Sequence, residues 1–163
     1  VAGVVNLPEE LFGKLKKNIL PQWKVCFWSA IIVGLITHLY KIVNWLPNWD
    51  SLVFRYDAQN MVSMGSWFLP VASAASSFYD LPWITGLLAI LFHALGAVCI
   101  CKMFDVKKNT TALLIGTAVV SFPTVTSVML YNYVADSYAL SFLLACLAAL
   151  FKCSIAFSLF PIY

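Results

Sequence analysis

Four long apolar stretches limit the folds open to this chain more than any other feature of its sequence. Each has roughly the 20 residues that a helix needs to cross the hydrocarbon core of a bilayer. None shows the short alternation of apolar and polar residues that marks a barrel strand. Backbone groups in lipid must be paired within the protein, which a helix achieves along its own length. We therefore predict an all-α, polytopic transmembrane helix bundle with four spans, at about 25–45, 82–104, 110–130 and 137–157.

The composition supports a membrane location. Apolar residues make up 62% of the chain and charged residues only 10%, against about 25% charged in an ordinary soluble domain. A soluble chain of 163 residues could not bury so much apolar surface, so lipid must cover part of it. The basic residues are too few, and too close to the apolar stretches, for a nucleic-acid partner. The five cysteines lie in or beside the apolar stretches and complete no metal-binding set, so we interpret them as packing residues.

The remaining segments lie on the membrane surface in this interpretation. Residues 1–24 contain a short amphipathic helix that starts at Pro8-Glu9-Glu10, with apolar and lysine side chains on opposite faces. We expect 1–24 to be a cytoplasmic amphipathic segment and 25–163 to be the transmembrane domain. Residues 46–81 form a polar, aromatic-rich loop, in which pieces such as 51–64 are expected to be short surface helices. Because the chain starts without Met and stops soon after an apolar stretch, we expect it to be the N-terminal part of a longer protein.

Charged residues sort between the two sides that the four spans define. One side carries only two basic residues, Lys41 and Arg55, together with most of the carboxylates, Asp50 and Asp136 among them. Basic residues collect on the cytoplasmic side of membrane proteins. We therefore predict a multi-pass protein of the cytoplasmic (inner) membrane, with a cytoplasmic N-terminus and with these carboxylates on the outer face. The eight basic residues of the other side are Lys14, Lys16, Lys17, Lys24, Lys102, Lys107, Lys108 and Lys152.

Two outer carboxylates are candidates for chemistry. Asp50 lies just past the first span, where a carboxylate is costly unless it is paired or hydrated. A functional role and an N-cap role in a surface helix are equally favoured there. Asp136 lies between the third and fourth spans, with Tyr131 and Asn132 just before it. Asp136 either caps the fourth helix or belongs to a sugar site, because aromatic rings stack on sugar faces and amides bind hydroxyl groups.

Other polar and helix-breaking residues also have a structural and a functional interpretation. Arg55, the only arginine, either pairs with a nearby carboxylate or holds a phosphate through two parallel N–H groups. His38 and His93 lie within spans, where hydrogen-bonded packing is favoured over ligand binding. Pro123 removes a helical hydrogen bond and should bend the third span, which either opens a cavity or serves packing alone.

Four sequence blocks occur in a fixed order along the chain. They are Asn48-Trp49-Asp50-Ser51-Leu52; Gly65-Ser66-Trp67-Phe68-Leu69-Pro70; Leu81-Pro82 with Gly86-Leu87-Leu88; and Ser121-Phe122-Pro123-Thr124-Val125-Thr126, which continues to Tyr131 and Ala135-Asp136-Ser137-Tyr138. In this order and topology, the chain from about residue 36 onward resembles the polytopic bacterial and phage-type O-antigen glucosyltransferases, the type II glucosyl transferase family.

The resemblance implies a membrane glycosyltransferase of the GT-C kind, of whose helix bundle this chain is the N-terminal part. Such enzymes move a glucosyl unit from a polyprenyl-phosphate carrier to O-antigen or another surface glycan outside the cytoplasm. For this chemistry we choose Asp50 as the general base, and Asp136 as the carboxylate that orients the acceptor or assists the base. No cofactor or metal ligand is assigned, and a divalent cation, which some such enzymes need, is left open. The expected substrate-binding residues are Asn48, Arg55, Trp67, Tyr131 and Asn132.

One position departs from the family pattern, because the usual Arg of the second block is Ser66 here. If that Arg holds the lipid phosphate, we expect this chain to use Arg55, Lys41 or a group beyond Tyr163. The rival interpretations are a transporter or flippase for a lipid-linked or other polar substrate, and a non-catalytic membrane subunit. The acids cluster in the outer loops and only His93 lies deep in a span, which favours the enzyme.

Overall fold

The computed structural model describes residues 19–44, 46, 49, 52, 62–63, 65–76 and 81–159. Within these residues the chain is all-α, as predicted, and contains no strand. The amphipathic helix expected within 1–24 and the surface helices expected within 51–64 lie largely outside the described residues. The elements are α2 (Pro21–Val43), α5 (Leu69–Ser73), the 3-10 helix η1 (Ala74–Ser76), α6 (Pro82–Met103), α7 (Asn109–Ser121), α8 (Pro123–Met129) and α9 (Ala135–Leu159).

The described helices have the length and the apolar surface of membrane-spanning helices. Helices α2, α6 and α9 are each long and apolar enough to cross one, and the bent pair α7–α8 makes a fourth candidate if it is one span. Large apolar side chains point outward from the bundle, such as Ile36, which is 73% exposed, and Leu114, which is 64% exposed. Such surfaces need lipid around them. The chain is therefore a multi-pass membrane protein.

Local sequence signals explain where these helices begin and end. Helices α2, α6 and α8 each begin with a proline, whose missing N–H is harmless in a first turn. Helix α6 ends in a Schellman motif, in which the Val106 amide donates to the Cys101 carbonyl at 3.0 Å. In the same motif the Asp105 amide donates to the Lys102 carbonyl at 3.2 Å. Asp105 supplies the left-handed residue (φ 46°), which Asp adopts more readily than most residues.

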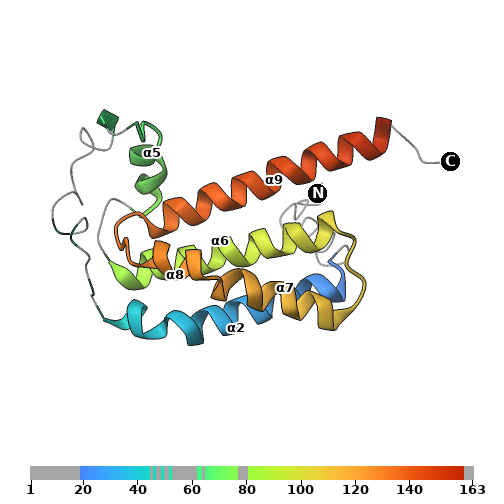
Figure 1. Ribbon diagram of the computed structural model, residues 1–163, viewed down its shortest axis with the longest axis horizontal. Coiled ribbons are helices and arrows are strands. Elements are labelled where there is room, and N and C mark those ends of the chain that lie inside the picture. The colour runs from blue at the N-terminus through green and yellow to red at the C-terminus, as the bar shows by residue number, and fades with distance from the viewer. Residues whose placement is uncertain are drawn as a thin grey trace, which may run out of the picture.

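Helix α6 is the centre of the bundle and packs against α2, α7 and α9 (Figure 1). Glycines bring the helices close together. A Cβ added at Gly116 of α7 would collide with the backbone carbonyl of Cys26 in α2, and one at Gly86 of α6 would lie 2.7 Å from Ile42 of α2. Small residues allow this close approach, which helix pairs in membranes use in place of a hydrophobic driving force. These contacts fix the bundle on which the functional site is built.

The third predicted span is broken where α7 meets α8. The two helices are bent by 42°, and Pro123 is the first residue of α8. Val120 lies in the last turn of α7, where carbonyl groups have no helical donor. His38 of α2 donates from Nε2 to the Val120 carbonyl at 2.9 Å. The predicted bend at Pro123 and the predicted hydrogen-bonded packing of His38 are both confirmed.

The bundle has two chemically different ends. At one end Gln22 donates to the Lys107 carbonyl at 2.8 Å, and the Lys102 ammonium lies 5.7 Å from the centre of the Trp23 ring. The start of α2, the end of α6 and the start of α7 therefore meet at what we call the lysine end. At the opposite end α2 finishes, α6 and α9 begin, and α5 lies against α9 (Figure 1).

Candidate functional site

Among the described residues, five buried polar side chains lie around the start of α9, and the buried Thr85 at the start of α6 donates to the Leu81 carbonyl at the same end of the bundle. The five side chains come from α5 with η1, from the turn before α9, and from the first turn of α9 (Figure 1). Each exposes 5% or less of its surface. Polar and ionisable groups inside a membrane protein are costly, so such a group indicates a function. We call these residues, Ser73, Ser76, Asn132, Asp136 and Ser137, the polar cluster.

Serine hydroxyls of the polar cluster hold α5 against α9. The Ser73 and Ser137 hydroxyl oxygens lie 3.1 Å apart and share a hydrogen bond. The Ser76 hydroxyl donates to the Ser73 carbonyl at 3.1 Å, and the Ser141 hydroxyl donates to the Ser137 carbonyl at 3.0 Å. The serines are thus engaged with each other and with the backbone, which gives the cluster a defined geometry.

Asp136 and Asn132 differ from these serines because they have unpaired polar atoms. Among the described residues, neither carboxylate oxygen of Asp136 has a hydrogen-bond partner, and the Nδ2 of Asn132 has none either. The Asp136 carboxylate lies near the hydroxyl groups of Ser76 and Ser137 without reaching normal hydrogen-bond geometry. Buried polar side chains are nearly always paired, so an exception calls for a functional explanation. The carboxylate therefore has hydrogen-bond acceptor capacity that no described residue uses with normal geometry.

The structure does not support the capping alternative for Asp136. Helix α9 begins at Ala135, so Asp136 already lies inside the first turn, whereas an N-cap precedes the helix. The backbone N–H groups of Asp136 and Ser137 lie near the carboxylate, but neither reaches it with normal hydrogen-bond geometry. Its place near the helix N-terminus still favours a negative charge, because the helix dipole is positive there.

A small pocket lies beside the polar cluster, between residues 65–72 and α9. Its volume is about 220 Å³, and its lining includes the side chains of Ser66, Trp67, Tyr138 and Ser141. Trp67 is 73% exposed, so the face of its ring is open to a ligand. An open indole ring beside hydroxyl groups has the chemistry of a sugar site. We call this hollow the Trp67 pocket.

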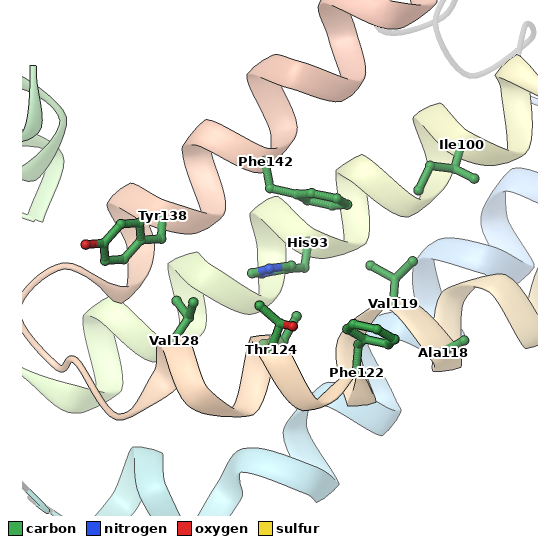
Figure 2. Close-up of a pocket in the computed structure, with 10 residues that line it drawn as sticks. His93, Ile100, Ala118, Val119, Phe122, Thr124, Val128, Tyr138 and Phe142 are labelled. Atoms are coloured by element: carbon green, nitrogen blue, oxygen red, sulfur yellow. The ribbon is translucent and has the colours of Figure 1, made fainter.

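A larger apolar groove lies deeper in the bundle, and we call it the His93 groove. Its volume is about 520 Å³, and it lies between α9 on one side and α7 with α8 on the other (Figure 2). The His93 ring stacks on Phe142 with the ring centroids 5.2 Å apart, and its Nδ1 donates to the Ala89 carbonyl at 2.8 Å. The predicted hydrogen-bonded packing of His93 is therefore confirmed. Tyr138 lines both the His93 groove and the Trp67 pocket.

The structure brings several predicted site residues together. Asn132 and Asp136 both belong to the polar cluster, and Trp67 lines the adjacent pocket. The Tyr131 ring packs edge-on against Tyr138 with the centroids 6.5 Å apart. The described residues contain no group of three His, Cys, Asp or Glu side chains that could hold a metal ion. Three predicted site residues lie outside the described part of the chain and stay predictions: Asn48, Asp50 and Arg55.

Sequence reasoning missed several residues that the structure places at the site, among them Ser73, Ser76, Ser137, Tyr138 and Ser141. Tyr138 lies two residues after Asp136 in the last of the four sequence blocks, and that block was the signal that could have identified it. Ser73 and Ser76 carry no such signal, because only the tertiary fold brings α5 and η1 to the start of α9.

The fold and the site define a class: a multi-pass membrane protein with a polar site at one end of its helix bundle and an apolar groove beneath that site. The family model described as Glucosyl transferase GtrII matches residues 39–161, and the chain belongs to this family. It is therefore a membrane glucosyltransferase, as the resemblance implied. No curated protein and no solved structure matches the chain.

Proposed function

We propose that this chain transfers a glucosyl unit from a polyprenyl-phosphate carrier to O-antigen or another surface glycan on the outer face of the cytoplasmic membrane. Family membership supplies the glucosyl transfer. The observation that carries the rest is the buried Asp136 carboxylate, which has no hydrogen-bond partner of normal geometry among the described residues. Asp136 lies two residues before Tyr138, which lines the Trp67 pocket. A carboxylate in that state is suited to bind and activate an acceptor hydroxyl group.

The lysine end of the bundle supports the orientation. Lys24, Lys102, Lys107 and Lys108 lie at or near this end, on α2, on α6 and in the turn that follows α6. Asp105 pairs with Lys107 at 2.9 Å, and this hydrogen bond to a carboxylate raises the pKa of the lysine. Because basic residues favour the cytoplasmic side, we assign the lysine end to the cytoplasm. The polar cluster at the opposite end then faces the outside, where the proposed acceptor glycan is assembled.

Glucosyl transfer requires the acceptor hydroxyl to lose its proton as its oxygen attacks C1 of glucose. The new O–C1 bond forms while the C1–O bond to phosphate breaks, and the electron pair of that bond leaves with the phosphate. The proton passes to a carboxylate. Asp50 is the proposed base, and Asp136 orients the acceptor hydroxyl or takes the proton itself. Trp67 and Tyr131 offer ring faces for the sugars, and the Asn132 amide offers a donor.

The departing phosphate needs a positive charge or hydrogen-bond donors nearby. None of the described residues that line the Trp67 pocket is basic, and Ser66 stands where the resemblance places an arginine. The Lys41 ammonium, at the end of α2, donates to the Leu46 carbonyl. We therefore assign the phosphate to Arg55, whose guanidinium can hold two phosphate oxygens at once.

The test is a transfer assay with the full chain in liposomes, supplied with radiolabelled polyprenyl-phosphate glucose and a lipid-linked O-antigen acceptor. Asp50→Asn and Asp136→Asn are made separately. A positioned acid or base contributes about 100-fold or more, so loss of the base should lower the rate by at least that factor without changing expression or membrane insertion. Asp105→Asn, the same substitution at the lysine end, is the matched control and should retain the parent rate.

The outcomes separate the proposed function from its rivals. Full activity in Asp50→Asn removes Asp50 as the base, and full activity in Asp136→Asn removes the buried carboxylate from the mechanism. Movement of the labelled donor across the bilayer without transfer identifies a flippase instead. Neither transfer nor movement with the parent chain refutes the proposed donor and acceptor.

A further inference from the structure

The His93 groove is not explained by chemistry at the polar cluster. Its volume of about 520 Å³ exceeds that of the Trp67 pocket, at about 220 Å³. Helix α6 forms its floor through His93 and Ile100, as Figure 2 shows. Only His93, Thr124 and Tyr138 bring polar side-chain atoms to its lining, and the other lining residues are apolar. An apolar hollow of this kind favours hydrocarbon over water.

The break in the third span shapes one wall of this groove. Phe122 and Thr124, on either side of Pro123, both line it, at the place where α7 and α8 are bent by 42°. Phe122 is 58% exposed, so this wall is open toward the surrounding lipid. The sequence left open whether the bend opens a cavity or serves packing alone, and the structure places a cavity there.

Tyr138 joins the groove to the Trp67 pocket. Its side chain lines both hollows and is 45% exposed. Figure 2 shows its hydroxyl group pointing away from His93 and Phe142. On the far side of Tyr138 the lining gains the hydroxyl groups of Ser66 and Ser141. Polarity therefore rises along one path, from hydrocarbon-like walls in the middle of α9 to hydroxyl groups near its start.

A molecule that fits this path has a hydrocarbon chain at one end and a polar group at the other. We propose that the His93 groove holds the hydrocarbon chain of the lipid-linked sugar donor, with the sugar in the Trp67 pocket and with Tyr138 at the junction. This inference rests on the proposed function, which names a lipid-linked donor. It adds where the lipid lies: between α9 and the bent pair α7–α8, with direct entry from the bilayer. A neighbouring helix or a second copy of the chain would fill the groove without needing its connection to a hydroxyl-lined pocket.

The first experiment fills the groove. Ala118 lines it from α7, and Ala118→Trp places an indole where the lipid chain would lie. The measurement is the ratio of kcat/KM for a long-chain donor to kcat/KM for a short-chain polyprenyl-phosphate glucose. Displacing about two methylene groups from apolar surroundings changes affinity by about tenfold, so we expect the ratio to fall by at least that factor. Leu113→Trp, at an exposed position on another face of α7, is the matched control and should keep the parent ratio.

The second experiment requires neither a substitution nor turnover. The parent chain in liposomes is irradiated with a polyprenyl phosphate that carries a diazirine within its hydrocarbon chain, and the labelled peptides are identified by mass spectrometry. We expect label on α7, α8 and α9 at residues of the groove lining, and loss of that label when unmodified polyprenyl phosphate is added in excess.

The two experiments distinguish this inference from the proposed function. If the parent chain transfers no glucose but the groove is labelled and competed, the proposed function fails and the lipid site stands. If transfer occurs but Ala118→Trp keeps the parent ratio, or the competed label lies elsewhere, the groove is not the lipid site. Crosslinks from the groove to another protein segment in place of lipid also overturn the inference.

Discussion

Asp136→Asn should separate catalysis from stability at the polar cluster. The substitution keeps the size and shape of the side chain and removes its charge. The proposed mechanism needs that charge, whereas no described residue forms a hydrogen bond with it. We therefore expect transfer to fall while the free energy of unfolding rises, which is the reverse of what the loss of a structural carboxylate would do.

The expected size of the stability change follows from two opposing effects. A buried polar group without a partner costs about 1–3 kcal/mol, and a charged group costs more than a neutral one. Asp136 is 1% exposed, so it bears most of this cost. The positive end of the α9 dipole stabilises a negative charge in the first turn by about 0.3–1 kcal/mol, which offsets part of the cost of burying the carboxylate. The neutral Asn side chain lacks this stabilisation. We expect a net gain of about 1 kcal/mol in the free energy of unfolding.

The assay is denaturant unfolding of the detergent-solubilised chain, followed by circular dichroism, alongside the transfer assay. Asp105→Asn is the matched control, because Asp105 is exposed and Asn also tolerates its left-handed conformation. This control should stay within about 0.5 kcal/mol of the parent chain. A loss of more than about 1 kcal/mol in Asp136→Asn would refute the reasoning, because it would mean that the carboxylate bonds donors in the rest of the protein and has a structural role.

Other predictions concern packing, the broken span and the pocket. Gly116→Ala should lower the free energy of unfolding by about 1–3 kcal/mol, because the new Cβ meets the backbone of α2 at 2.4 Å. Gly34→Ala should cost less, because its new Cβ meets a methyl group of the Ile90 side chain at 2.9 Å and no backbone atom. Equal losses in thermal unfolding would contradict this ranking. His38→Leu should cost about 1–3 kcal/mol by leaving an α7 carbonyl unpaired. His38→Gln, which retains an N–H donor, should recover part of that loss, and no recovery would mean that packing alone matters. Ser66→Arg should lower the KM for the phosphate-bearing donor by about threefold or more through a charge-assisted hydrogen bond, and an unchanged KM would place the phosphate away from this pocket.

The membrane fold could be predicted because bilayer thickness and proline chemistry act locally. Each predicted span follows from a hydrocarbon core of fixed width, and the bend at Pro123 follows from a missing N–H. The pairing of helices could not be predicted in the same way. Gly116 allows α7 to approach α2 closely, but several glycines in the apolar stretches could serve such a contact, and only the tertiary fold selects among them.

The candidate site was predictable only as far as residue chemistry allowed. Asp136 and Asn132 stood out as polar residues between two apolar stretches, but a helix cap and a functional carboxylate look alike there. The two interpretations differ by two residues in the start of α9, and assignments of helix ends commonly differ by one or two residues. What distinguishes them is a property that no sequence carries: Asp136 is fully buried, while the nearby hydroxyl of Ser137 is bonded to that of Ser73. A carboxylate that is enclosed by the fold and left unpaired by its described neighbours is available to a substrate, and that is why Asp136 rather than its serine neighbours is assigned to the chemistry.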